Sequence, residues 1–240
     1  MNLHWRLWSR HLLAYVVVML ALLPHKVISR ESDLAGEFGT DACRRAGVSL
    51  TATADDVYRQ GVLSAKTELS ASSDALLQCA VELGGPDYVG LVAAQLLALD
   101  DPRAERMLMV AAAMGLADSQ QRLGKHLMKG AATREDRLAA FAYLRAAVAG
   151  CSVIALESMF EAAVSARDSA MLLETAALIQ IELEKMPAGD SGFRHYSRQL
   201  AELRRLMTSS EIKLSKSRSR QVRGALTSCA APEADNSRRR

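Results

Sequence analysis

The chain has 240 residues, of which half are hydrophobic and only 5% are aromatic. This length suffices for one sizeable domain or an extended stack of repeats. The abundance of alanine and leucine favours helices packed through small side chains and argues against a β-sandwich or barrel. The net charge of +3 is unevenly spread: residues 208–240 carry +5 and residues 1–29 carry +3, which leaves 30–207 mildly acidic at −5.

Residues 1–29 have the organisation of an export signal. Two arginines precede an apolar run over 12–23, and Val27 and Ser29 supply the small side chains that a signal peptidase needs. As a helix this run would span roughly 18 Å, less than a hydrocarbon core of about 30 Å. We therefore expect a signal peptide cleaved after Ser29 and a periplasmic or secreted protein. An uncleaved membrane anchor is the alternative.

Residues 30–71 predict two N-terminal helices. The first covers 33–45, and Thr53 caps a second that runs to about residue 69. Two further helices follow. Ser72 and Ser73 would cap the first of them, and the second covers 88–99.

The next two helices resemble one another. Asp101 with Pro102 restarts the chain as a helix, and segment 101–115 aligns with 136–150 at a constant offset of 35 residues. The second segment is preceded by Thr133, at capping-box spacing from its first aspartate. Both segments end in a glycine, which can take the left-handed conformation that closes a helix. A period in this range is typical of stacked helical hairpins.

This pattern resembles the Sel-one-like repeat (SLR), a relative of the tetratricopeptide repeat. The resemblance rests on Ala104, the pair Ala111 and Ala112, the closing glycine, and Leu123-Gly124 in the following helix. In the second repeat, Ser158 and Met159 occupy the places of that Leu-Gly pair. The resemblance implies an all-α protein, a right-handed α/α solenoid of helical hairpins, and a scaffold that binds protein. We assign the repeat domain to residues 72–207.

Two more helices, 169–185 and 193–207, complete this domain, and the basic segment 208–240 has no apolar periodicity. We expect a disordered basic tail. Charge alone would allow it weak contact with an anionic surface, and the alternative is a solvated tail that loosely neutralises the acidic body. The lack of interleaved aromatic residues disfavours nucleic acid.

The four cysteines predict disulfide bonding in an oxidising compartment, because none forms a CxxC and no Cys/His spacing suits a metal. Cys43 and Cys79 flank a predicted helical hairpin, so we expect them to pair. The alternative is four free thiols, three of them small apolar fillers.

No motif predicts catalysis, a metal or a cofactor. The letters of Gly189-Asp190-Ser191-Gly192 match those around a serine nucleophile, and His195 follows. That reaction also needs an orienting acid and an oxyanion hole on a rigid scaffold, and helix-linker chemistry explains the four residues equally well. A lone His126 on a helix is more often structural than a ligand.

The predicted binding surface follows from the alignment of the two repeats. Ala104, Met107 and Ala111 form one stripe, and Ala139, Ala142 and Ala146 match them. The opposite face would then present four residues to a partner: Arg106, Val110, Phe141 and Arg145. The resemblance places this face on the concave side of the superhelix, where it suits an acidic, partly apolar peptide or helix. The alternative has Phe141 in the core and the arginines merely solvated.

We therefore expect an exported bacterial-type scaffold, not an enzyme, that mediates protein–protein interaction in the cell envelope or in secretion. An exported cell-wall hydrolase with a site of unrecognised residues is the alternative. A third possibility, an intracellular scaffold, applies if residues 1–29 are not an export signal.

Overall fold

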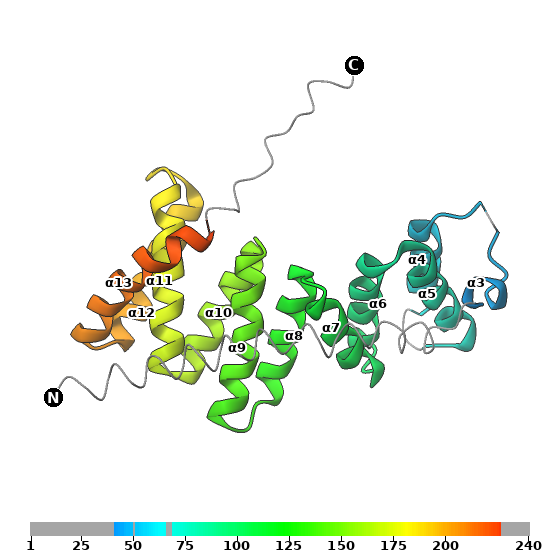
Figure 1. Cartoon of the computed structure of the whole chain (residues 1–240), viewed down its shortest axis with the longest axis horizontal. Helices are drawn as coiled ribbons and strands as arrows, with labels where there is room; N and C mark the ends of the chain where they lie inside the picture. Colours follow the sequence, from blue (N-terminus) through cyan, green and yellow to red (C-terminus); the bar gives the residue numbers. More distant parts are fainter. Residues whose placement is uncertain (1–40, 50, 66–68, 227–240) are drawn as a thin grey trace, which may run out of the picture. The chain divides into compact units, whose positions relative to one another are not determined.

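The computed structural model describes residues 41–49, 51–65 and 69–226 (Figure 1). Every regular element in these ranges is a helix and none is a strand, so the all-α prediction is confirmed. The predicted signal peptide lies outside the described residues. Within them, no helix is both long and apolar enough to cross a membrane. The helices are α3 (Ala42–Arg45), α4 (Ala54–Ser64), α5 (Ala71–Gly84), α6 (Pro86–Ala98), α7 (Arg103–Ala113), α8 (Ala117–Gly130), α9 (Arg134–Ala149), α10 (Val153–Ala166), α11 (Ser169–Lys185), α12 (Ser191–Leu206) and α13 (Ser209–Leu226).

The chain divides into two compact units, residues 1–114 and 115–240, and each is described by itself. Helices α3 to α7 belong to the first unit and α8 to α13 to the second. The division falls within 72–207, the segment that the sequence predicts as one repeat domain.

Several helices begin at the caps that the sequence predicts. Thr53 accepts a hydrogen bond from the backbone of the first turn of α4, and Thr133 and Asp136 form a reciprocal capping box at α9. Helix α5 begins earlier than expected, because Ser70 forms a capping box with Ser73. These side chains satisfy backbone N–H groups that have no partner within the helix.

In the first unit, α4 packs along α5, and α6 packs against both of them and against α7. Gly61 of α4 lies directly against α5: a Cβ atom built on it would stand 2.9 Å from a methyl carbon of Leu77. Such a distance is below van der Waals contact, so the glycine is what permits this approach of the two helices.

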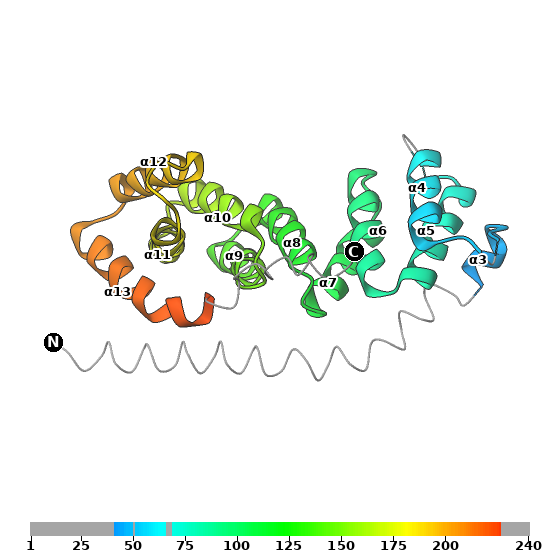
Figure 2. The same cartoon turned by 90° about the horizontal axis from the view of Figure 1, so that it is seen from above.

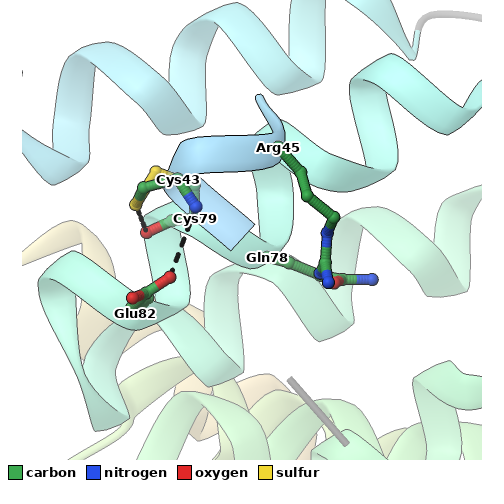
Figure 3. The surroundings of a disulfide bond; sticks show 5 residues. All are labelled: Cys43, Arg45, Gln78, Cys79 and Glu82. Carbon is green, nitrogen blue, oxygen red and sulfur yellow. Dashed lines mark hydrogen bonds between the residues drawn. A yellow bond between two sulfur atoms is a disulfide. The ribbon is translucent and has the colours of Figure 1, made fainter. Parts of the chain in front are cut away.

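A disulfide joins the short helix α3 to α5 (Figure 3). The Cα atoms of Cys43 and Cys79 are 4.4 Å apart, which confirms the predicted pairing. Two hydrogen bonds flank the bridge: the Cys43 N–H donates to Glu82, and the Arg45 guanidinium donates to Gln78. Cys151 is disulfide-bonded as well, so the alternative of four free thiols is wrong. The bridge holds α3 over a small apolar cluster of Ala42, Val57, Leu76, Cys79 and Ala80.

We predict that replacing Cys43 and Cys79 together by serine lowers the free energy of unfolding of the first unit by up to about 4 kcal/mol. The bridge spans 36 residues, and closing a loop of this length restricts the unfolded chain by about that amount in the chain-entropy model. Denaturant unfolding under oxidising conditions measures the difference. Alkylation of Cys43 in the unreduced wild-type protein would contradict the pairing.

The second unit has two layers of helices (Figure 2). Helices α8, α10 and α12 form one layer and α9, α11 and α13 the other. Helix α8 pairs closely with α9, and α10 then packs against both of them. Helix α12 packs in the same way against both α10 and α11. In this unit α8 and α9 therefore form a hairpin in which α9, which contains segment 136–150, is the second helix. The sequence alignment treats the same segment as the first helix of a hairpin.

Glycines set the spacing of α8 and α9. A Cβ atom on Gly124 would stand 2.8 Å from the Leu144 side chain and 3.0 Å from the Ala140 carbonyl oxygen. Gly150, after α9, would clash with Ala117 of α8 in the same way. Its φ is −82°, and the left-handed residue is the following Cys151, so the predicted left-handed closure holds for Gly115 but not for Gly150.

We predict that Gly124→Ala destabilises the second unit by roughly 1–3 kcal/mol, because overpacking at a buried contact outweighs the better helix propensity of alanine. Gly130→Ala is the matched control, since a Cβ atom there meets nothing within 4 Å. It should be neutral or slightly stabilising. Thermal unfolding measures the melting temperatures of both variants. Equal melting temperatures would contradict the close approach of α8 to α9 at Gly124.

The predicted disordered tail is wrong for residues 209–226, which form α13 against α11. The buried side of α13 is built from serines, which an apolar periodicity does not reveal. Ser215 and Ser219 are fully buried, and each hydroxyl donates to a carbonyl oxygen of its own helix. Ile212 and Val222 add partly buried contacts to the core. Residues 227–240 lie outside the described residues.

Candidate functional site

The predicted buried stripe of α7 is confirmed. Ala104, Met107 and Ala111 are all buried. Arg106, on the opposite side of the helix, is exposed, and Val110 is half-buried. Met109 lies on the same exposed side with 41% of its surface accessible. The α7 face therefore combines arginine with apolar side chains, as the sequence predicts.

The corresponding prediction for α9 is wrong. Phe141 is only 6% exposed and lies in the core of the second unit, and Arg145 is half-buried. The residues expected to be buried are not: Ala139 and Ala142 are exposed, and Ala146 is half-buried. The buried stripe of α9 consists instead of Ala140, Phe141, Leu144, Ala147 and Val148.

A shift of one residue explains this error. Buried residues of α7 and α9 correspond at an offset of 36, which pairs Ala104 with Ala140 and Leu108 with Leu144. The matching letters that fix the alignment stand at an offset of 35. One residue turns a helix by about 100°, which is enough to exchange a solvent-facing side for a buried one. The four predicted residues also belong to two different units.

A second surface in the first unit was not predicted. We call it the α4–α6 surface and define it by Asp55, Tyr58 and Arg59 of α4 and Tyr88 and Leu91 of α6. The two tyrosine rings meet edge to face, with centroids 6.0 Å apart. The Tyr58 hydroxyl donates to the Leu91 carbonyl oxygen over 3.4 Å, and the Tyr88 hydroxyl donates to the Asp55 carboxylate. These contacts join α4 to α6, the first helices of the two successive pairs α4–α5 and α6–α7.

The α4–α6 surface has the chemistry of a protein-binding site. Both tyrosines are half-buried, so part of each ring faces solvent. Leu91, whose carbonyl oxygen accepts the Tyr58 hydroxyl, has 42% of its surface accessible. Rings fixed by neighbouring contacts lose little conformational entropy when a partner covers them, and tyrosine is enriched at the centres of interfaces. A rigid aromatic pair beside an exposed leucine therefore suits an apolar side chain of another protein.

Sequence reasoning missed this surface because Tyr58 and Tyr88 stand 30 residues apart in helices that show no letter similarity. Asp55 lies in the first turn of α4, where a carboxylate is favoured by the helix dipole, and its side chain also accepts the Tyr88 hydroxyl. The separation of the two tyrosines also differs from the 35-residue offset of the repeated segments, so the repeat pattern does not select the pair.

The Gly189–Gly192 linker is a helix start. The Asp190 carboxylate accepts the Gly192 N–H at 2.6 Å and caps α12. His195 contacts Glu157 of α10 at 2.9 Å, and Gln199 donates to the same carboxylate. Burial raises the pKa of Glu157, but these hydrogen bonds lower it more, so its pKa lies below the ordinary value. In the part of the chain that the structure describes, no hydrogen bond joins Ser191 to His195.

No group of three or more His, Cys, Asp or Glu side chains among the described residues could hold a metal ion. His126 is half-buried on α8. Comparison of the chain with protein-family models, with curated proteins and with solved structures finds no match.

We predict that Asp55→Asn lowers the pKa of Tyr88. The hydrogen bond to the Asp55 carboxylate holds the pKa of this phenol above its ordinary value, burial adds to the effect, and the negative charge opposes ionisation. Without the charge, the phenol ionises at lower pH. An NMR titration of the Tyr88 ring resonances measures the shift, and Asp56→Asn on the same turn is the matched control. An unchanged Tyr88 titration in Asp55→Asn would mean that the two side chains do not interact in solution.

Proposed function

We propose that this protein is an exported helical-repeat scaffold that binds another protein in the cell envelope or during secretion. The recurrent packing in the second unit carries the proposal: α10 packs against both helices of the preceding pair, and α12 packs in the same way against α10 and α11. Helix pairs that contact mainly their neighbours build solenoids, and the surfaces of solenoids serve as extended binding sites. A right-handed solenoid of the Sel-one-like type is the specific form we propose.

The α4–α6 surface is our candidate for the partner site. Its exposed leucine and fixed tyrosines provide apolar contact area, and Asp55 and Arg59 at its edge provide polar contacts. The partner is a protein segment that places an apolar side chain against the tyrosine pair and Leu91. The α7 face with Arg106, which suits an acidic and partly apolar peptide, is the second candidate surface.

Crosslinking in the native host followed by affinity capture identifies the partner, and three variants then locate its site. Leu91→Glu places a charge on the α4–α6 surface and should weaken binding of the purified partner by tenfold or more, about the loss expected at an interface hot spot. Arg106→Glu tests the α7 face. Ile154→Glu introduces the same charge at a side chain that is 67% exposed on α10, and should leave the affinity unchanged.

All three variants alter exposed side chains, so the melting temperature should stay within a few degrees of wild type, and circular dichroism verifies this first. Loss of affinity in Arg106→Glu alone would assign the site to the α7 face. Unchanged affinity in both Leu91→Glu and Arg106→Glu would exclude both surfaces.

A further inference from the structure

Helix α13 exposes a row of three cations, which we call the α13 stripe: Lys213, Lys216 and Arg220. Their spacing is i, i+3 and i+7, so they share one side of the helix. The row covers about 10 Å along the axis, at 1.5 Å per residue. All three side chains are exposed.

The other two arginines of α13 fix the orientation of the stripe. Arg218 pairs with Glu174 of α11 at 2.9 Å, and Arg223 pairs with Glu184 of the same helix. The fully buried Ser215 and Ser219 lie against the core side. The helix therefore cannot turn its cations toward the protein without breaking these contacts, and the stripe faces solvent.

The charges of the stripe are not compensated within the described part of the chain. None of the ion pairs among these residues involves Lys213, Lys216 or Arg220, and the Arg220 Nε–H donates only to the Lys216 carbonyl oxygen. The one carboxylate of α13, Glu211, bonds to Thr208 and Ser169. Like charges at these spacings destabilise a helix slightly, so an external anion would relieve their repulsion.

Helix α8 provides an instructive contrast. Arg122, Lys125 and Lys129 have the same spacing of i, i+3 and i+7 and are also exposed. There the central Lys125 lies 3.7 Å from Glu161 of α10, and Asp118 stands in the first turn of the same helix. The row on α8 is thus partly neutralised within the protein, whereas no carboxylate among the described residues pairs with the row on α13.

We propose that the α13 stripe docks the protein on an anionic lipid surface. Its cations have long flexible stems and no carboxylate partner among the described residues, which suits mobile headgroups whose positions adjust to the protein. No aromatic residue stands on α13 for base stacking. This docking does not depend on the partner-binding role of the α4–α6 surface.

Cosedimentation with phosphatidylcholine vesicles, with and without phosphatidylglycerol, tests the proposal on protein recovered from its host after export. The wild-type protein should prefer the anionic vesicles, and added salt should reduce the preference. The triple change Lys213→Gln, Lys216→Gln and Arg220→Gln should lower the partition coefficient about a hundredfold, since each basic residue contributes roughly fivefold. Glutamine retains helix propensity, and circular dichroism verifies the fold.

Two further variants test whether a loss of binding is specific to the α13 stripe. One controls for the change in net charge, and the other keeps the charge while changing the side chains. Arg122→Gln, Lys125→Gln and Lys129→Gln change the net charge equally and should reduce binding by less than about fivefold, the effect of one basic residue at the lipid surface. Lys213→Arg with Lys216→Arg keeps the charge and should bind as wild type does. Equal loss in both glutamine triples, or no preference of the wild-type protein for phosphatidylglycerol, would overturn the proposal. In the second case, binding of an oligonucleotide or an acidic peptide through the stripe would identify the other class of ligand.

Discussion

The close approach of helices through small residues is the constraint on which this structure depends. Gly61 brings α4 against α5, and Gly124 does the same for α8 against α9. Where α13 meets α11, buried serines take the place of glycine. Their hydroxyl groups donate to carbonyl oxygens of their own helix, so these two buried hydroxyls are satisfied. With few aromatic side chains available to fill wide gaps, the helices pack tightly because their facing residues are small.

Polar contacts add a second constraint at the starts of helices. In the first unit, Arg103 at the start of α7 reaches Asp74 in the first turn of α5. In the second unit, Arg134 at the start of α9 bonds to Asp168, which also caps α11. Burial raises the pKa of Asp168, but the hydrogen bonds that it accepts lower the pKa by more, so its pKa lies below the ordinary value. Each contact ties the start of one helix to the start of the helix two positions along the chain.

The two candidate binding surfaces follow from this packing. Tight contact on one side of each helix leaves the other side free to carry residues that the core does not need. On α4 and α6 these are tyrosines and a leucine that hold one another in place. On α13 they are cations, held outward by two ion pairs and two buried serines. The first surface suits an apolar protein segment and the second a diffuse negative charge.

The sequence by itself determined the helical class, several helix starts and the Cys43–Cys79 pair, because caps, prolines and the flanking of a hairpin act locally. Only the tertiary structure decided which side of α9 is buried. The matching letters of segments 101–115 and 136–150 stand 35 residues apart, but the buried residues of α7 and α9 stand 36 apart, and burial depends on neighbouring helices. The same reason explains α13: serines that pack well against α11 look like linker residues in the sequence. Local signals therefore predict where a helix begins, while its orientation is fixed by contacts between residues far apart in the chain.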